Sequence, residues 1–290
     1  MHARVVAAMS AAILGVVALL LPVHDARAGS TFRPAVIAHR GASAHAPENT
    51  LAAVDEAASL GIRWVENDVQ RTKDGELVVI HDDSLRRTTD AEEVFPGRSP
   101  WKVRDFTAAE IARLDAGSWF GAAYTGARVP TLKEYVDRVE SHHQKLLLEV
   151  KNPELYPGIE RQTLELLSNE GWLDRRHLTN RLIVQSFSAD SLRTVHDLKP
   201  AVRTGLLGRP ALADLPRCAG FADLVNPSYT GLSPAYVSVV HALTGPHGKP
   251  MKVFAWTVDD PATAEAVAGY GVDGVITNKP DVVRRALYGY

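Results

Sequence analysis

Two carboxylates and a histidine lie close together in the sequence, on either side of a turn. Glu66 and Asp68 are two residues apart in an apolar run, so an extended strand directs both side chains to one face. Asp74-Gly75 is a strong hairpin signal, and a two-residue type I′ turn there pairs Asp68 with His81 on the returning strand. Their Cβ atoms would then lie roughly 5 Å apart. The pattern predicts a site where two acids meet a histidine.

Further polar residues end two other predicted strands. His39 and Arg40 close the first apolar run after residue 34, and Glu149 and Lys151 share one face at the end of a later run. A guanidinium is a permanently charged fork of donors that suits phosphate oxygens, with a salt bridge at the rim as the structural alternative. A carboxylate such as Glu149 is costly to bury unless it is paired or binds a metal.

The combined set favours a metal-assisted reaction with acid–base catalysis. Three converging carboxylates repel one another unless a cation lies between them, and their oxygens favour Mg²⁺ or Ca²⁺. The sequence has neither the cysteine cluster nor the His-Glu-x-x-His motif of a zinc site. Two histidines beside such an ion, His39 and His81, suit a paired general base and general acid.

Eight short apolar runs alternate with helical segments along the chain. The predicted strands are 35–40, 64–69, 145–151, 181–186, 202–207, 222–226, 251–257 and 272–277. The predicted helices are 47–60, 131–139, 158–169, 190–198, 233–243 and 261–269. This alternation is typical of a parallel α/β fold, and eight strands predict a TIM-type (β/α)8 barrel whose strand ends carry the polar residues above. A doubly wound open sheet has the same alternation and is the alternative.

Two segments depart from the regular alternation. Residues 76–81 are predicted to form the returning arm of a β-hairpin after the second strand, above the barrel. Residues 83–130 contain no regular α/β unit and form a predicted insertion before the next helix. An insertion of this size is usually a functional lid or small subdomain, with a surface decoration as the alternative.

The first 28 residues have the composition of a signal peptide. Arg4 supplies a positive charge, residues 5–21 carry no charge, and Ala26-Arg27-Ala28 is a small-residue cleavage site. We expect cleavage after Ala28, export by the general secretory route, and a secreted or extracytoplasmic barrel domain at 29–290. An uncleaved membrane anchor is the alternative, because the apolar run approaches the length of a transmembrane helix.

Charge and cysteine content narrow the range of partners. The 290-residue chain has a formal charge of −2, which becomes −3 without the first 28 residues. The sequence has no basic arm, block or stripe, so we expect neither nucleic acid as a partner nor stable membrane association once the signal is removed. Cys218 is the only cysteine, so no internal disulfide is expected.

A series of short motifs runs across nearly the whole chain after residue 38. They are His39-Arg40-Gly41, Pro47-Glu48-Asn49-Thr50, Glu66-x-Asp68-Val69, Thr72-Lys73-Asp74-Gly75, Val78-Val79-Ile80-His81-Asp82, Leu114-Asp115-Ala116-Gly117-Ser118-Trp119-Phe120, Pro130-Thr131-Leu132-x-Glu134, Glu149-Val150-Lys151, Gln185-Ser186-Phe187, Trp256-Thr257-Val258 and Asp273-Gly274-Val275-Ile276-Thr277-Asn278. The series resembles the glycerophosphodiester phosphodiesterase family in content and order. The resemblance implies a barrel that cleaves glycerophosphodiesters, small-molecule substrates, to sn-glycerol 3-phosphate and an alcohol. It also implies an insertion after the His81 arm.

The resemblance implies a role for each polar residue of the site. It assigns acid–base catalysis to His39 and His81, metal binding to Glu66, Asp68 and Glu149, phosphate binding to Arg40 and Lys151, and the substrate side of the pocket to Trp256. A tryptophan on a strand is ordinarily part of the core, so Trp256 has a packing role as its alternative. Gln185 receives no role. Asn67 departs from the apolar residue usual between the two acids and faces away from them.

Several choices stay open at this point. Either histidine can be the base, either Mg²⁺ or Ca²⁺ can be the cation, and either the glycerol 2-hydroxyl or a water can attack phosphorus. A phospholipase D-like enzyme of the sphingomyelinase D type is the alternative enzymatic function, because sphingomyelinase D resembles this family in its histidines and acids. A catalytically silent barrel that binds glycerophosphodiesters is the alternative outside enzymology.

Overall fold

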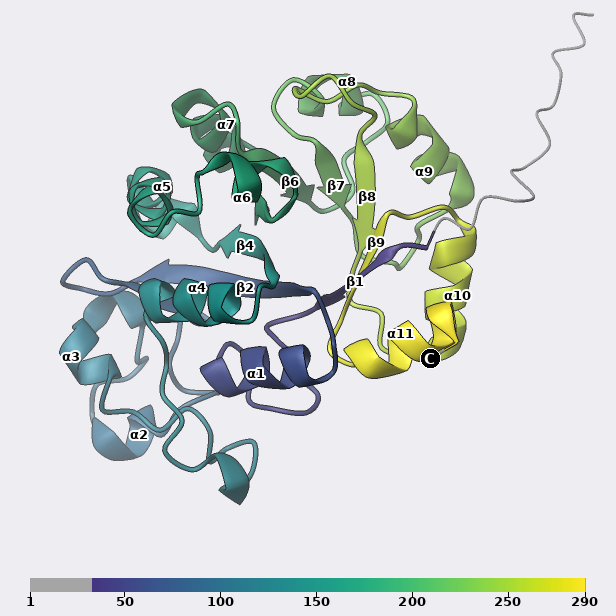
Figure 1. Ribbon diagram of the computed structural model, residues 1–290. Coiled ribbons are helices and arrows are strands. Elements are labelled where there is room, and N and C mark those ends of the chain that lie inside the picture. Colours follow the sequence, from purple (N-terminus) through teal and green to yellow (C-terminus); the bar gives the residue numbers. More distant parts are fainter. Residues whose placement is uncertain (1–32, 290) are drawn as a thin grey trace, which may run out of the picture. The chain divides into compact units, whose positions relative to one another are not determined.

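The computed structural model describes residues 33–289, in which eight strands form a closed parallel ring (Figure 1). The strands are β1 (Ala35–Ala38), β2 (Trp64–Arg71), β4 (Lys145–Val150), β5 (Leu182–Ser186), β6 (Arg203–Leu207), β7 (Leu224–Asn226), β8 (Lys252–Ala255) and β9 (Gly274–Thr277). The ring closes because β1 pairs with both β2 and β9. This closure confirms the predicted (β/α)8 barrel and excludes the open sheet. The expected signal peptide, 1–28, lies outside the described residues.

Alternate strand residues point into the ring and outward, as the period of a strand requires. Those that fill the ring form one buried cluster of Ile37, Trp64, Leu147, Ile183, Leu224, Phe254 and Ile276. The outward residues join the helices in the main core. β1 and β8 end two residues earlier than predicted, so His39, Arg40 and Trp256 follow the strands on the C-terminal side of the barrel.

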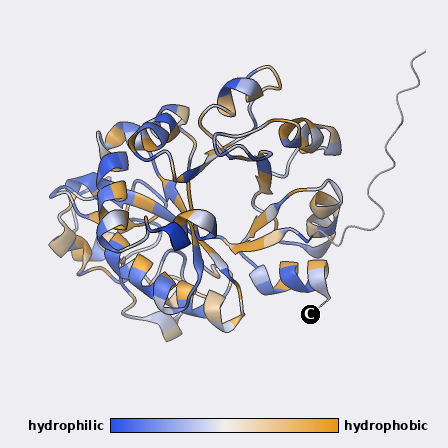
Figure 2. Cartoon of the chain, turned by 45° about the horizontal axis from the view of Figure 1, so that its top comes forward, coloured by the Kyte–Doolittle hydropathy of each residue, from blue (hydrophilic) through white to orange (hydrophobic). Residues whose placement is uncertain are grey.

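Amphipathic helices surround the ring, and hydrophobic and hydrophilic residues alternate along them in Figure 2. Six of them match the predicted helices: α1 (Leu51–Ser59), α4 (Leu132–Ser141), α5 (Ile159–Asn169), α7 (Ala189–Leu198), α9 (Pro234–His241) and α10 (Pro261–Gly269). Three more were not predicted: α6 (Arg175–Asn180), α8 (Leu215–Cys218) and α11 (Pro280–Tyr288). Within residues 33–289, no helix has both the length and the apolar character needed to cross a membrane.

The first helix begins four residues later than predicted. The expectation of a helix from residue 47 was wrong because Thr50 is the N-cap: its side chain accepts a hydrogen bond from the Ala53 N–H. Asn49 has a positive φ of 59°, which is not a helical conformation. Residues 47–50 therefore form a loop, and this loop carries Glu48 and Asn49 to the C-terminal end of the barrel.

The arm β3 (Leu77–Val79) pairs antiparallel with β2, as predicted, but in a different register. Val69 faces Val79, and Ile80 N–H donates to the carbonyl of Asp68, so Asp68 is opposite Ile80 and not opposite His81. The two-residue turn was wrong because a type I′ turn needs positive φ at both central residues, and only Gly75 has it. Thr72 instead closes a longer turn, in which its hydroxyl accepts from the Glu76 N–H and donates to Asp74.

Residues 83–130 contain short helices around a small core of their own. They include α2 (Ala91–Val94), α3 (Ala108–Ile111) and 3-10 turns at Val103–Asp105 and Ala122–Tyr124. Their core consists of Val78, Ile80, Leu85, Ala91, Val103, Phe106, Ile111, Leu114, Ala116 and Val129. Because Val78 and Ile80 belong to this second core, the hairpin arm connects the insertion with the barrel.

Candidate active site

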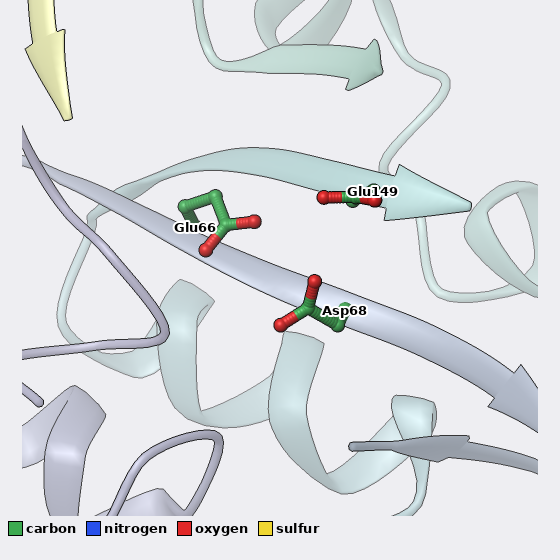
Figure 3. Close-up of side chains that lie close together, drawn as sticks. All are labelled: Glu66, Asp68 and Glu149. Atoms are coloured by element: carbon green, nitrogen blue, oxygen red, sulfur yellow. The ribbon is translucent and has the colours of Figure 1, made fainter. Parts of the chain in front are cut away.

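Three carboxylates converge at the C-terminal end of two neighbouring strands. β2 carries Glu66 and Asp68 and β4 carries Glu149, which is in register with Asp68. One oxygen from each acid lies within 4.8 Å of the others, and the side chains point toward one another in Figure 3. All three are buried, with 1%, 1% and 6% of their surface exposed. The spacing of the acids in the sequence thus brings them together as predicted.

Burial and mutual repulsion shift the pKa values of these acids. Burial and the charges of Asp68 and Glu149 raise the pKa of Glu66 well above its ordinary value. Burial and Asp68 likewise raise the pKa of Glu149 to about 8. Burial also raises the pKa of Asp68, but the charges of Arg40 and Lys151 outweigh it and the net shift is downward. Without a cation, Glu149 therefore retains its proton at neutral pH, and the same two causes favour the protonated form of Glu66.

The donor set fits a hard divalent cation. Asp68 Oδ1 is buried and has no hydrogen-bond partner among the described residues. Such an oxygen is costly to bury, and a cation that binds it together with the facing oxygens of Glu66 and Glu149 removes that cost. An all-oxygen donor set is the type that Mg²⁺ and Ca²⁺ prefer. Glu66, Asp68 and Glu149 are therefore the residues that would hold a metal ion.

Arg40 is fixed beside the acids by its backbone and its side chain. Its φ of 56° is left-handed, and its backbone N–H donates to Glu66 Oε2 at 2.8 Å. The guanidinium Nε lies 3.5 Å from Asp68 Oδ2, and another guanidinium nitrogen donates to Glu48 Oε1 at 2.9 Å. Burial lowers the pKa of Arg40, but Asp68 and Glu48 raise it further, so the group stays charged.

Lys151 supplies a second positive charge on the other side of the acids. Its Nζ lies 2.9 Å from Glu149 Oε1 and 3.8 Å from Asp68 Oδ1, and only 9% of the residue surface is exposed. Burial lowers the pKa of Lys151, while the two acids raise it above its ordinary value. The site thus has one permanent cation on each side of the carboxylates.

His39 has a fixed ring orientation. Its Nδ1 lies 2.7 Å from Asn278 Oδ1, an oxygen that also accepts from Ser43 Oγ at 2.8 Å. The amide of Asn278 is oriented by its nitrogen, which donates to Asp259 at 2.7 Å. His39 Nδ1 is therefore the donor, and the lone pair of the neutral ring is on Nε2. Burial and the charge of Arg40 lower the pKa of His39 to about 4, so the ring is neutral at pH 7.

His81 has a carboxylate as its partner. Its Nδ1 lies 2.7 Å from Asp82 Oδ1, and hydrogen bonds from His81 and Arg87 hold the pKa of Asp82 well below its usual range. Arg87 comes from the insertion and binds Asp82 and Glu48 at the same time, each through two nitrogens. Because Glu48 also binds Arg40, a chain of alternating charges connects His81 to Arg40.

A pocket of about 100 Å³ unites these groups. It is lined by His39, Arg40, Glu66, His81, Glu149, Lys151, Gln185, Phe187, Leu207, Trp256, Thr257 and Ile276. Asp68 lies beneath it, in contact with Arg40 and Lys151. The structure thus brings together all eight residues singled out in the sequence, although the register argument that paired Asp68 with His81 was wrong. His81 reaches the pocket because it lies beyond the end of β3.

One wall of the pocket is aromatic. Trp256 is half-buried, and its indole N–H donates to the Asn226 carbonyl at 2.5 Å. Its ring meets Phe187 edge to face, with ring centroids 5.8 Å apart. Phe187 is 55% exposed, which is unusual for a large apolar side chain. Trp256 therefore lines the pocket with part of its ring and also packs against the apolar cluster inside the barrel, so the structure shows both of the roles considered for it.

Four residues that hold the site received no role from the sequence. Asn49 donates to Asp68 Oδ2 at 2.8 Å, and Gln185 donates to Glu66 Oε1 at 3.3 Å. Asn278 orients His39, and Arg87 holds Asp82, the carboxylate partner of His81. Asn49, Gln185 and Asn278 are polar residues within the motifs, and Gln185 and Asn278 are also at strand ends, which was the available signal. Arg87 offered none, since its partners are 5 and 39 positions away.

A parallel barrel with three acids, two histidines and two cations at its C-terminal face defines a metal-dependent hydrolase of phosphate esters. Residues 39–282 match the model of the glycerophosphoryl diester phosphodiesterase family, and this chain belongs to that family. It is an enzyme, a phosphodiesterase, as the sequence predicted.

Similar proteins span almost the whole chain. A glycerophosphodiester phosphodiesterase of Bacillus subtilis is 34% identical over 289 residues, which is 94% of this chain and 94% of the relative. One from Caldanaerobacter subterraneus is 38% identical over 250 residues, 86% of this chain and 95% of the relative. Among solved structures, an Oleispira antarctica phosphodiesterase in complex with the product sn-glycerol-3-phosphate has a TM-score of 0.75 at 30% identity, covering 88% of this chain and 97% of that one.

Proposed function

We propose that the protein hydrolyses glycerophosphodiesters to sn-glycerol 3-phosphate and an alcohol, with one divalent cation, Mg²⁺ or Ca²⁺, held by Glu66, Asp68 and Glu149. The observation that carries the proposal is the single pocket in which these acids meet two histidines and two cations. The product named for the Oleispira antarctica enzyme, sn-glycerol-3-phosphate, supports the same chemistry here.

The charged residues of the pocket match a phosphodiester in a pentacovalent transition state. The bound cation would supply positive charge that polarises the phosphoryl group and lowers the pKa of the attacking hydroxyl. Arg40 and Lys151 donate to the phosphate oxygens from opposite sides and offset the negative charge that develops on them. Both are already fixed by acids, so little reorganisation accompanies the reaction.

The two histidines take different roles because they have different partners. His39 is neutral with its lone pair on Nε2, so it accepts the proton of the attacking hydroxyl, whether that belongs to the glycerol 2-position or to water. His81 is held through Nδ1 by the carboxylate of Asp82 instead of an amide, and the second proton transfer falls to it because His39 takes the first. His81 then protonates the departing alcohol.

The test is product release from a panel of glycerophosphodiesters, with and without added divalent metal. Glycerophosphocholine, glycerophosphoethanolamine and glycerophosphoinositol are each expected to yield sn-glycerol 3-phosphate when Mg²⁺ or Ca²⁺ is present. Tight binding without turnover would indicate a silent binding protein. Activity on sphingomyelin in micelles, without activity on soluble diesters, would indicate the phospholipase D-like alternative.

We also propose that the protein acts outside the cytoplasm after cleavage of its signal peptide behind Ala28. The support is the composition of the first 28 residues. The intact mass of the protein purified from its own cells is expected to match a chain whose first residue is Gly29. A mass that includes residues 1–28 would point to a retained anchor.

A further inference from the structure

The N-terminal end of the barrel, opposite the active site, gathers positive charge. Cations stand at the start of five strands: Arg63 directly before β2, Lys145 at the start of β4, Arg181 directly before β5, Arg203 at the start of β6 and Lys252 at the start of β8. The first three are adjacent, because the Lys145 N–H donates to the Arg63 carbonyl and the Leu146 N–H donates to the Arg181 carbonyl, each at 2.7 Å.

Successive side chains of a strand point alternately into and out of the ring, and this alternation directs Lys145, Lys252 and Arg203 into it. Lys145 is two residues before Leu147 and Lys252 is two residues before Phe254, and both apolar residues belong to the cluster inside the barrel. Arg203 has the same parity as Leu207, which lines the active-site pocket. Burial and then the charges of Arg63, Arg203, Arg181 and Lys252 lower the pKa of Lys145, so these cations lie close enough to repel one another.

Acids neutralise only part of this charge. Arg181 pairs with Glu140 at 2.6 Å, and Lys252 lies 3.9 Å from Asp273. Among the described residues, Arg63, Lys145 and Arg203 have no ion pair. Two guanidinium nitrogens of Arg203 are buried without any hydrogen-bond partner there. Asp223, whose charge reaches Arg203, instead accepts from the Thr204 N–H and binds His247.

Two adjoining hollows open beside these cations. One of about 330 Å³ and one of about 690 Å³ share Arg63 and Lys145 as lining residues. The cations that line them are Arg63, Lys145, Arg175, Arg176, Arg181 and Arg284, and no described lining residue is an acid. In a chain with a formal charge of −2, such separation of charge concentrates a positive field at one end.

We propose that this end of the barrel is a second anion site, which binds a phosphate group through Arg63 and Lys145. The charge of Arg203 adds to the positive field around Lys145. Guanidinium and ammonium groups without acid partners are the donors that phosphate oxygens take in proteins. Arg63 and Lys145 border both hollows and have no acid partner among the described residues, so their donors are available to a phosphate. The phosphate group belongs either to a free phosphate monoester or to the headgroup of an anionic phospholipid. The site is separate from the reaction proposed above.

Calorimetric titration of the Mg²⁺-loaded enzyme with inorganic phosphate at low ionic strength tests the proposal. We expect two binding events, one at the active site and one at the basic end. The variant Arg63→Gln/Lys145→Gln should weaken one event at least ~10-fold, since each charge-assisted hydrogen bond contributes measurably. Arg40→Gln should weaken the other event. Arg203→Gln supplies an independent variant of the basic end.

A second arm identifies the source of the phosphate. Sedimentation with phosphatidylcholine vesicles, with and without phosphatidylglycerol, shows whether a headgroup is bound. Vesicle binding that requires phosphatidylglycerol and is lost in Arg63→Gln/Lys145→Gln assigns the site to lipid. A second phosphate-binding event, at the basic end, without vesicle binding assigns the site to a free monoester.

The control variant Arg86→Gln/Lys133→Gln removes the same charge from ion pairs elsewhere on the surface. It should bind both probes like the parent. A single phosphate event in the parent, combined with no vesicle binding, would overturn the proposal, and so would equal losses in the control. Turnover of glycerophosphocholine is expected to be unchanged in Arg63→Gln/Lys145→Gln, so the outcome is independent of the proposed hydrolysis.

Discussion

At the scale of single residues, the partner of each histidine decides its part in the reaction. Burial and Arg40 keep His39 neutral, and the Asn278 amide oxygen leaves its lone pair on Nε2, whereas the partner of His81 is the carboxylate of Asp82. The two rings thus differ in chemistry although they line the same pocket. A substrate whose leaving group needs no proton separates the two roles.

We expect His81→Gln to lower kcat on glycerophosphocholine by roughly 10²-fold or more, and far less on a p-nitrophenyl ester of glycerol phosphate, because nitrophenolate departs without a proton. His39→Gln should lower kcat on both substrates by a similar factor. Steady-state kinetics with the two substrates measure this, with circular dichroism as the check on folding. Equal losses for His81→Gln on both esters would contradict its assignment as the acid.

Asn67 is a residue whose side chain costs stability. It is fully buried on β2, and both its amide atoms have no hydrogen-bond partner within the described chain. We expect Asn67→Val to raise the free energy of unfolding by about 1–2 kcal/mol, because an unpaired buried amide is replaced by an apolar group. Urea denaturation measures the change.

Gln70 on the same strand is the matched control for Asn67. It is equally buried, but its amide donates to the carbonyls of Ile80, His81 and Asp82. Gln70→Leu should therefore lower stability where Asn67→Val raises it. A loss of stability in Asn67→Val would show that the amide has a partner in solution. Turnover should be unchanged in Asn67→Val, since the side chain faces away from Glu66 and Asp68.

At the scale of elements, the turn after β1 positions the first catalytic residues. Gly41 has a φ of 78°, and a Cβ added there would lie 2.5 Å from Ala53 Cβ on α1. Gly41→Ala should lower the free energy of unfolding by about 2 kcal/mol or more, because strain and overlap add. Activity should fall as well, since the displaced turn carries His39 and Arg40.

Gly158→Ala is the control for the turn after β1, because Gly158 has a similar φ of 80° but no atom within 4 Å of the added Cβ. It should show the cost of the left-handed conformation alone, about 1 kcal/mol. Thermal denaturation and kcat/KM of both variants separate strain from overlap. Equal effects of the two substitutions would show that contact with α1 is unimportant.

The sequence predicted which strands and helices form better than it predicted where they begin and how the turns between them are built. All eight strands were expected because β-branched runs separated by helical segments are strong local patterns. The helix expected from residue 47 and the two-residue turn were wrong because Thr50 and Thr72 form side-chain hydrogen bonds that compete with those local patterns. α8, with four residues, is too short to give a periodic pattern.

For the proposed site, the ends of the barrel strands were enough to find most of its residues, because parallel strands of a barrel all end at one face. His81 instead follows the antiparallel arm β3. The residues that orient them could not be found this way. Asn278 meets His39 across 239 positions of sequence, and Arg87 joins Asp82 to Glu48 from within an irregular insertion. Nothing local in the sequence encodes such pairings.

At the scale of the whole molecule, the acid cluster couples activity to metal and pH. Chelation should abolish turnover, and Mg²⁺ or Ca²⁺ should restore it and raise the melting temperature, because the ion binds only the folded protein. The pKa of Glu149 is about 8 without metal, so below pH 8 the ion must displace a proton. The affinity for the metal ion should therefore fall as the pH decreases, by up to about tenfold per pH unit for each proton released.

Calorimetry in buffers of different ionisation enthalpy measures both the metal affinity and the protons released. Glu149→Gln is the matched variant: it should bind metal more weakly and release fewer protons. Full turnover in excess chelator, or an affinity that does not change between pH 6 and 8, would contradict the assignment of these acids to the metal.

The closure of the ring by β1 and β9 has a consequence for biosynthesis. β1 pairs with β9 across most of the described sequence, and His39, directly after β1, lies 239 positions before its partner Asn278, directly after β9. A growing chain therefore carries His39 without the amide that fixes its ring until the segment after β9 has been made. Pairing of such distant segments is also slow to form. A chain that stops before β9 therefore has an open barrel, and its His39 ring has no amide partner.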